Sequence, residues 1–320
     1  MKILVVRFSS IGDIVLTTPV VRCIKQQVKG VELHYLTKKT FGSIVQNNPY
    51  LDKVYSIEKE IDEVLKELKK EKYDLVIDLH HNLRTLTLKL KLGVKTFSFN
   101  KLNYAKWLKV NLKINALPNV HIVDRYFETL ETLGVKNDNQ GLDYFIPIPD
   151  QVNTTALHPS LAKGFYALVV GGSYFTKQIP VDKLIAICDL ADKPVVLLGG
   201  KADRALAEKV AELSKGNVIN TCGDLRLDQS ASLVQQADKV ITSDTGLMHI
   251  ASAFKKDIVS IWGNTIPEFG MYPYLPGPNS KILEVKGLFC RPCSKLGYRK
   301  CPKGHFKCMM QIEVKEAFNS

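Results

Sequence analysis

The amino-acid sequence predicts an α/β protein in which two doubly wound parallel sheets form two domains. Three observations support this prediction. The length of 320 residues suits two cores of about 150 residues each. Short β-rich runs alternate with helical stretches in both halves, as in βαβ units. Between the halves, Phe145–Gly164 carries three prolines and no clear period, which indicates a linker or an irregular crossing.

The first domain is expected to span residues 1–150. Its expected strands are Lys2–Arg7, Glu32–Leu36, Lys53–Ser56, Leu75–Asp78 and Thr96–Phe99. Helical patterns lie between these strands, most clearly over Glu58–Lys72, where charged residues recur at helical spacing. A further helix is predicted over His121–Leu133, where Gly134 ends it.

The second domain is expected to span residues 151–320. Its expected strands are Ala167–Val170, Val195–Leu198, Val218–Asn220, Lys239–Thr242 and Ile258–Ile261. Its expected helices are Val181–Leu190, Asp203–Leu213, Leu227–Gln236 and Gly246–Phe254. We expect the two Rossmann-like domains to face each other across a cleft.

The composition is ordinary for a soluble globular protein, with 45% hydrophobic and 24% charged residues. No apolar run approaches the roughly 18 residues that a membrane-spanning helix needs. The N-terminal apolar run is four residues long before Arg7, and a secretory signal needs about 7–15. We therefore expect a cytoplasmic protein.

The formal net charge of +12 is unevenly distributed along the chain. Between Arg84 and Asn115 there are eight basic residues and no acidic residue, with four aromatic residues among them. The basic residues are Arg84, Lys89, Lys91, Lys95, Lys101, Lys106, Lys109 and Lys113. Such a segment suits an anionic surface, either phosphorylated lipid headgroups or nucleic acid. A solvated lysine face is the alternative.

Two common nucleotide-binding motifs are missing from the sequence. Neither the first turn, SSIGD, nor the later turn GGSYFTKQ has the spacing G-x-G-x-x-G, which disfavours a dinucleotide oxidoreductase. The Walker phosphate loop G-x-x-x-x-G-K-[ST] does not occur either.

The stretch SSIGD, Ser9 to Asp13, directly follows the first expected strand. Open α/β sheets bind their ligands at the carboxyl ends of the strands. Asp13 is therefore a candidate for chemistry, and capping of the following helix is the alternative.

The stretch SDTGLMHIASAF, Ser243 to Phe254, lies between an expected strand and an expected helix. Gly246 allows close backbone approach, and the free N–H groups of the helix N-terminus suit a phosphate. An ordinary cap by Asp244 or Thr245, with His249 packed on the helix, is the alternative.

The stretch GGSYFTKQIP, Gly171 to Pro180, follows the first strand of the second domain. Lys177 stands just before a helix that Pro180 opens, where its charge could neutralise a diphosphate. A solvated loop lysine is the alternative.

The seven cysteines form two groups. Cys23, Cys188 and Cys222 lie in apolar contexts and are expected to be buried. The other four lie in CRPCSKLGYRKCPKGHFKC, with His305 among them: Cys290, Cys293, Cys301 and Cys308. The C-x-x-C pair is typical of a structural zinc site, but the second pair is more widely spaced. A reduced cysteine-rich loop is the alternative, and no metal is assigned.

Several segments together resemble glycosyltransferase family 9, the ADP-heptose:lipopolysaccharide heptosyltransferases. These segments are SSIGDIVLTTP, YDLVIDLHHNLRT, TKQIP, LLGGKADRALAEKV, and SDTGLMHIASAF followed by WGNTIP. The resemblance runs from Met1 to about Ile312 and implies a GT-B fold. It further implies that the N-terminal domain holds the acceptor, that the C-terminal domain holds the nucleotide sugar, and that transfer inverts the anomeric configuration without a metal or other cofactor.

The resemblance also implies roles for individual residues. Asp13 becomes the general base, a role worth about 10²–10⁴-fold in rate. The implied donor-binding and phosphate-binding residues are Thr176, Lys177, Asp244, Thr245, Gly246 and His249. The implied acceptor-binding residues are Ser10, Gly12, His80 and Arg84. The family places a ribose-binding carboxylate directly after Gly200, where this chain has Lys201, with Asp203 two residues further on.

The implied reaction moves a heptose from ADP-heptose to a phosphorylated lipid-linked oligosaccharide in lipopolysaccharide core assembly. The enzyme would be peripheral at the cytoplasmic face of the inner membrane, held to anionic lipid by residues 84–113, with no nucleic-acid partner. Two alternatives stay open. The departure at Lys201 leaves room for a GT-B transferase with a different nucleotide sugar, and the basic segment could belong to a non-catalytic nucleic-acid-binding protein.

Overall fold

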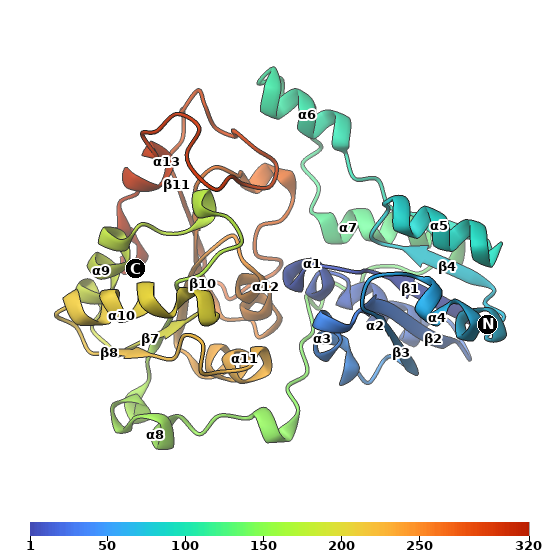
Figure 1. Cartoon of the computed structure of the whole chain (residues 1–320), viewed down its shortest axis with the longest axis horizontal. Helices are drawn as coiled ribbons and strands as arrows, with labels where there is room; N and C mark the ends of the chain where they lie inside the picture. Colours follow the sequence, from blue (N-terminus) through green and yellow to red (C-terminus); the bar gives the residue numbers. More distant parts are fainter. Residues whose placement is uncertain (320) are drawn as a thin grey trace. The chain divides into compact units, whose positions relative to one another are not determined.

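The computed structural model describes residues 1–319, and the chain divides into two compact units (Figure 1). The first unit comprises Met1–Lys101 and Val120–Phe145. The second comprises Leu102–Asn119 and the chain from Ile146 onwards. Among the described residues, no helix combines the length and the apolar character needed to cross a bilayer.

The first unit has a five-stranded parallel sheet in the order β3-β2-β1-β4-β5. Its strands are β1 (Lys2–Val6), β2 (Glu32–Lys38), β3 (Lys53–Ile57), β4 (Leu75–Asp78) and β5 (Thr96–Ser98). Its α-helices are α1 (Ile11–Val15), α2 (Thr18–Gln27), α3 (Ser43–Gln46), α4 (Asp62–Lys70), α5 (Leu83–Leu92) and α7 (Ile122–Phe127). Two 3₁₀ turns, η1 (Lys39–Phe41) and η2 (Glu128–Leu133), complete the unit.

The sheet of the first unit is covered because its strands are apolar on both faces. Leu4 and Val6 of β1 pack with Leu68 of α4 and Leu88 of α5 in one core cluster. The alternate residues Ile3 and Val5 are also fully buried, and α2 and α7 contact each other. Continuous apolar strands of this kind are typical of parallel sheets with helices on both faces.

The second unit has a six-stranded parallel sheet in the order β11-β10-β9-β6-β7-β8. Its strands are β6 (Tyr166–Val169), β7 (Val195–Leu198), β8 (Val218–Asn220), β9 (Lys239–Ser243), β10 (Asp257–Trp262) and β11 (Lys281–Glu284). Its α-helices are α6 (Asn103–Asn111), α8 (Thr154–Leu157), α9 (Val181–Leu190), α10 (Arg204–Leu213), α11 (Leu227–Gln236), α12 (Gly246–Ala253) and α13 (Lys307–Met310). Its 3₁₀ turns are η3 (Ile148–Asp150), η4 (Pro159–Lys163), η5 (Phe175–Lys177), η6 (Lys201–Asp203), η7 (Pro267–Phe269) and η8 (Val314–Ala317).

In the core of the second unit, helices that follow the first two strands and a helix near the C-terminus pack against the sheet. Leu184 of α9 and Val210 of α10 pack with Leu168 and Ile241 of the sheet, and Met309 of α13 belongs to the same cluster. The C-terminal segment is therefore part of this core.

The predicted class, two doubly wound parallel sheets, is confirmed. Most strands lie within one or two residues of their predicted bounds, and Val181–Leu190 and Leu227–Gln236 are helical as predicted. The helix predicted over Glu58–Lys72 begins only at Asp62, because the Glu63 carboxylate accepts the N–H groups of residues 58–60 at 2.7–2.8 Å and holds them in a turn. The helix predicted over His121–Leu133 changes to a 3₁₀ turn at Glu128.

Each sheet has a point at which the strand order reverses, and open α/β sheets bind ligands there. In the first unit this point lies between β1 and β4, and in the second between β6 and β9. The stretches singled out in the sequence directly follow these four strands. Their loops therefore meet in pairs, one pair on each sheet.

Candidate active site

Asp13 lies in α1, the short helix after β1. Its Oδ2 accepts hydrogen bonds from the Ser10 backbone N–H at 3.1 Å and from the Ser10 hydroxyl at 2.7 Å. Its Oδ1 lies 2.6 Å from Nη2 of Arg7, and the side chain keeps 19% of its surface exposed. The carboxylate thus caps the helix and is still accessible to a ligand. Gly12 beside it is buried.

Arg7 is the buried cation beside Asp13, and no pattern in the sequence singles it out. Its Nε donates to the Ser9 carbonyl at 2.8 Å, and its Nη1 donates to the Leu79 carbonyl. Burial opposes the charged form, but the Asp13 carboxylate together with Tyr126 and Tyr35 outweighs this effect, so the pKa of Arg7 is raised. A fixed positive charge at this distance favours an ionised carboxylate, the form that accepts a proton.

His80 follows β4 and packs edge-on against Phe8, with ring centroids 5.2 Å apart. Burial, together with the positive charges of Arg7 and Lys101, lowers the pKa of His80 to about 4. The ring is therefore neutral at pH 7. Its Nδ1 is buried and has no hydrogen-bond partner among residues 1–319, so it can pair with a ligand.

Arg84 lies in the first turn of α5, and its guanidinium is 5.5 Å from the centroid of the Phe8 ring. Phe8, which directly precedes the Asp13 turn, thus packs against the side chains of both His80 and Arg84. Asp78, at the end of β4, accepts the N–H groups of His80 and His81 at 3.0 and 2.7 Å and pairs with Lys89 at 2.7 Å. Burial alone would raise the pKa of Asp78. The hydrogen bond from Lys89 and those from the backbone outweigh this effect, so the pKa is lowered. Asp78 therefore binds the turn as a charged carboxylate.

In the second unit, Lys177 and Asp244 form an ion pair across the reversal point of the sheet. The Lys177 Nζ lies 2.5 Å from Oδ2 of Asp244, and Lys177 ends η5 whereas Asp244 follows β9. Thr265, after β10, donates to the same oxygen at 3.1 Å. Three loops therefore meet at one carboxylate, and a cation stands at the carboxyl edge of the sheet.

The N-terminus of α12 adjoins this ion pair. Thr245 occupies the N-cap position, but its side chain makes no cap hydrogen bond. Its hydroxyl instead bonds with that of Thr242 at 3.0 Å. The first N–H groups of α12, from Gly246 onwards, are thus not capped by a side chain at this end, which suits an anion. His249 is packed in the helix with 2% exposure.

Thr176, an implied donor-binding residue, is bonded to the backbone of Tyr298. Its hydroxyl accepts the N–H of Tyr298 at 2.8 Å, and its own N–H donates to the Tyr298 carbonyl at 3.2 Å. With 1% exposure, Thr176 ties the Lys177 turn to the loop around Tyr298.

Asn264 was not proposed as a site residue, whereas Ser243 begins the stretch Ser243–Phe254 that was singled out for its possible phosphate contacts. The amide nitrogen and oxygen of Asn264 and the hydroxyl of Ser243 are buried, with no hydrogen-bond partner among the described residues. Buried polar groups are almost always paired, so these atoms are candidates for ligand contacts. The segment WGNTIP, which includes Asn264, was the available signal.

The departure at Lys201 has a structural counterpart. Lys201 is exposed, and Asp203 turns back so that its Oδ2 accepts the Gly200 N–H at 2.8 Å. A Cβ built on Gly171 would lie 2.3 Å from that oxygen. A carboxylate therefore does stand between the turns after β6 and β7, but it comes from Asp203.

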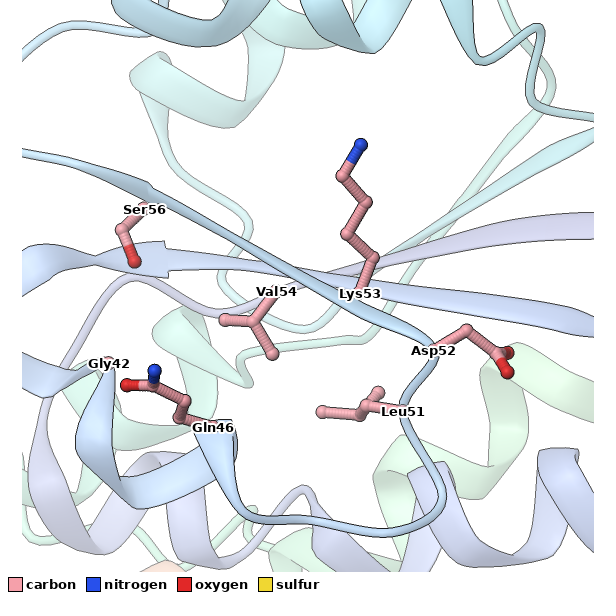
Figure 2. A pocket seen from close by; sticks show the side chains of 7 residues that line it. All are labelled: Gly42, Gln46, Leu51, Asp52, Lys53, Val54 and Ser56. Atoms are coloured by element: carbon pink, nitrogen blue, oxygen red, sulfur yellow. The ribbon is translucent and has the colours of Figure 1, made fainter.

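A pocket in the first unit lies away from the predicted site residues (Figure 2). Gly42, Gln46 and residues 51–54 and 56 line it. In Figure 2 the Lys53 and Asp52 side chains point away from Leu51, Val54 and Gln46. Lys53 pairs with Glu71, and Asp52 pairs with Lys25.

One group among the described residues has the spacing of metal ligands. Glu32, His34 and Glu71 each bring one ligand atom within 4.8 Å of the others. Lys2 lies 2.9 Å from Glu32 and 2.6 Å from Glu71, and Lys53 lies 2.9 Å from Glu71, so ammonium groups already pair with these carboxylates.

Comparison with known proteins gives the family. The family model of glycosyltransferase family 9 (heptosyltransferase) matches residues 61–299. The chain belongs to glycosyltransferase family 9. Lipopolysaccharide heptosyltransferase 1 of Campylobacter coli is 26% identical over 294 residues, which cover 83% of this chain and 84% of that protein.

Solved structures of family 9 proteins share the fold. A family 9 glycosyltransferase from Veillonella parvula superposes with a TM-score of 0.75 at 22% identity, over 88% of this chain and 86% of that chain. The ADP-heptose lipopolysaccharide heptosyltransferase II of Escherichia coli superposes with a TM-score of 0.70 at 18% identity, over 99% and 100%. The expected GT-B fold is confirmed.

Proposed function

We propose that this family 9 protein is an inverting transferase that moves heptose from ADP-heptose to a phosphorylated, lipid-linked oligosaccharide of the lipopolysaccharide core. The names of its relatives support the sugar and the nucleotide. The observation that carries the proposal is the N-terminus of α12, which has no side-chain cap at Thr245 and lies at the reversal point of one sheet. Lys177 adds a cation beside it, which would exchange Asp244 for a phosphate when a donor binds.

Asp13 is the general base in this proposal. The acceptor hydroxyl gives its proton to the Asp13 carboxylate while its oxygen bonds to C1 of the heptose and the bond from C1 to the diphosphate breaks. A single displacement of this kind inverts C1. General-base assistance is worth about 10²–10⁴-fold.

The departing ADP gains negative charge, and groups of the second unit can stabilise that charge. Lys177 supplies a cation, and the first amides of α12 supply oriented dipoles. In this proposal these groups take the place of a divalent metal. Asn264 and Ser243 have buried polar atoms that a bound donor would satisfy.

Arg84 and His80 are proposed to hold the acceptor. Arg84 offers a planar cation suited to a phosphate or carboxylate. His80 is neutral at pH 7 because its pKa is lowered to about 4, so it binds through hydrogen bonds without adding charge. Ser10 and Gly12 form the remainder of the Asp13 turn.

Association with a membrane surface is supported by α5. Leu83 and Leu90 are 82% and 76% exposed, and their spacing puts them on one face of the helix, away from the buried Leu88. Arg84 and Lys91 both lie along one side of this face. An exposed apolar stripe beside cations suits the interface of an anionic bilayer.

The basic segment is not uniformly available for lipid. Lys89 neutralises the buried Asp78, and Lys113 donates to the Val110 and Pro292 carbonyls at 2.8 and 2.7 Å. Lipid contact is proposed for Lys91, Lys95, Lys106 and Lys109, of which Lys91 also pairs with the exposed Asp62 at 2.5 Å.

A thermal-shift screen against ADP, GDP, UDP and CDP tests the nucleotide. A ligand that binds only the folded chain stabilises it by about 2.7 kcal/mol at a hundredfold excess over Kd. We expect ADP to give the largest shift, and ADP-heptose with a lipid-linked acceptor to give turnover with inverted product. Selective stabilisation by UDP, GDP or CDP would favour the alternative transferase. No shift with any nucleotide, together with a shift by oligonucleotides, would favour the nucleic-acid-binding protein.

A further inference from the structure

The turn after β10, residues 263–266, lies outside every helix and strand of the described chain. It adjoins Asp244, because β10 and β9 are neighbours in the sheet and Asp244 directly follows β9. The Thr265 hydroxyl donates to Oδ2 of Asp244 at 3.1 Å, and the Lys177 Nζ lies 2.5 Å from the same oxygen. The position of this turn therefore determines whether Asp244 keeps a second partner beside Lys177.

Arg291, in the irregular segment that follows β11, holds the turn after β10. Its Nε donates to the Gly263 carbonyl at 2.6 Å, and its Nη2 donates to the Thr265 carbonyl at 3.0 Å. Its Nη1 donates to the Val285 carbonyl at 3.2 Å, and its Nη2 lies 2.6 Å from Oε2 of Glu284. The side chain is 7% exposed, and each guanidinium nitrogen has a protein partner. Arg291 is thus placed to fix the turn rather than to bind an anion.

The chemistry of arginine suits this contact. A guanidinium is planar and carries its N–H donors in a fixed fork, so one side chain can hold two carbonyls at a set separation. Lysine would keep the positive charge that pairs with Glu284, but its single nitrogen has no such fork. The substitution Arg291→Lys therefore separates the fork from the charge.

We propose that Arg291 is a positioning residue of the donor site, which acts through Thr265 on Asp244. Lys177 exchanges Asp244 for a phosphate when the donor binds, an exchange that belongs to the proposed function and on which this inference rests. The Thr265 hydroxyl then stays as the partner of Asp244. The Asp244 side chain is 13% exposed, and a mostly buried carboxylate without a partner is costly. By holding Thr265 in place, Arg291 makes donor binding more favourable.

The segment that contains Arg291 also holds the Lys177 side of the ion pair. The Tyr298 N–H donates to the Thr176 hydroxyl at 2.8 Å, and the Thr176 N–H donates to the Tyr298 carbonyl at 3.2 Å. Thr176 directly precedes Lys177. Residues 291–298 therefore bond to the turns that carry Lys177 and Thr265, and they fix both turns from one side.

The test is calorimetric titration of the full-length chain with ADP in Arg291→Lys, in Thr265→Val and in the double variant. Each single variant should weaken ADP binding by about tenfold, the scale of one hydrogen bond to a charged group. The double variant should bind no more weakly than the weaker single variant, because both changes remove the same contact to Asp244. Thr265→Ser keeps the hydroxyl and should bind ADP as the wild type does.

Arg299→Gln is the matched control. Arg299 is an exposed cation of the same irregular segment, and it donates none of the bonds described above. Its replacement removes one positive charge and should leave ADP affinity unchanged. All titrations are made at a temperature at which thermal melting shows the variants to be folded.

Three results would overturn the inference. Additive losses of affinity in the double variant would show that Arg291 acts on the stability of the fold and not through Thr265. Wild-type affinity in Thr265→Val would overturn it even where Arg291→Lys does not fold. A wild-type chain that binds no ADP would overturn the proposed function as well, whereas ADP binding that is equal in the wild type and all variants would leave the proposed function standing.

Discussion

The Asp13 carboxylate and the buried Arg7 guanidinium are held together at 2.6 Å. Asp13, the proposed base, therefore also forms an ion pair with the buried side chain of Arg7. Asparagine caps a helix about as well as aspartate, but it is uncharged and cannot form an ion pair with Arg7. A substitution at this position changes both chemistry and stability, and the two effects need separate measurements.

Asp13→Asn should lower kcat by about 10²–10⁴-fold, because the amide cannot take the proton of the acceptor. The loss of the ion pair should lower the free energy of unfolding by about 1–3 kcal/mol. Donor affinity should be unchanged, since the proposed donor groups belong to the other unit. Turnover, ADP titration and thermal melting of the same variant give the three values.

Asp138→Asn is the matched control for the stability effect. Asp138 accepts two bonds from the buried Arg22 in the same unit, each at 2.8 Å. Its loss should destabilise the fold similarly while kcat is retained at a temperature where both variants are folded. If Asp13→Asn turned over like Asp138→Asn, Asp13 would be left as a helix cap.

Lys177→Ala should weaken ADP binding, because it deletes the cation proposed to face the two phosphates. Charge-assisted hydrogen bonds contribute roughly 1.5–3 kcal/mol, or about 10- to 150-fold in Kd. Calorimetric titration measures the change. The control is Lys193→Ala, which removes a lysine paired with Asp238 at 2.8 Å in the same unit. Equal ADP affinity in both variants would exclude Lys177 from the site.

Replacing Leu83 and Leu90 by serine should weaken binding to anionic vesicles by about tenfold or more, since each leucine contributes roughly 1.5–3 kcal/mol when fully buried. The unfolding temperature should not fall, because both side chains are exposed in the folded chain. Leu213→Ser removes a leucine that is 56% exposed on α10 and serves as the control. Vesicle sedimentation of the double variant at the wild-type level would mean that α5 does not contact lipid.

His80 should make the protein less stable in acid. Its pKa is lowered to about 4 in the folded chain, against about 6.5 in an unfolded one. Between these values the unfolded state binds more protons, so stability is complete above about pH 6.5 and falls as the pH drops toward 4. With allowance for partial exposure, the loss at pH 5 is on the order of 1 kcal/mol.

His80→Gln removes this titration and keeps a polar side chain. The drop in unfolding temperature between pH 7 and pH 5 should therefore be smaller in the variant than in the wild type. An equal drop in both would show that His80 is protonated as readily in the folded chain as in the unfolded one.

The sequence alone was sufficient to predict the class of fold, because hydrophobic runs and turn residues recur in both halves. The strand β11 was not predicted, since it has four residues and Ile282 within it is 43% exposed. Such a short edge strand lacks the continuous apolar run that distinguishes the buried strands.

Contacts within the candidate site were less predictable than its residues. Lys177 and Asp244 were both singled out, but their pairing depends on β6 lying next to β9. The order of strands in a sheet cannot be predicted from the local sequence pattern. The partners Arg7 and Thr265 were missed for a different reason. A single charged or hydroxyl residue carries no periodic signal in the sequence.

Residues 102–119 belong to the second unit, although the sequence on both sides of them belongs to the first. This arrangement determines where the chain can be cut into fragments that fold. The backbone passes between the units at Lys101–Leu102, Asn119–Val120 and Phe145–Ile146. A single proteolytic nick in Phe145–Gly164 would leave the halves joined by the other two passages. A fragment that starts at residue 151 would lack α6 and Lys113, whose ammonium group donates to the Pro292 carbonyl at 2.7 Å. An independently folding second half should therefore be made by carrying Leu102–Asn119 along with it.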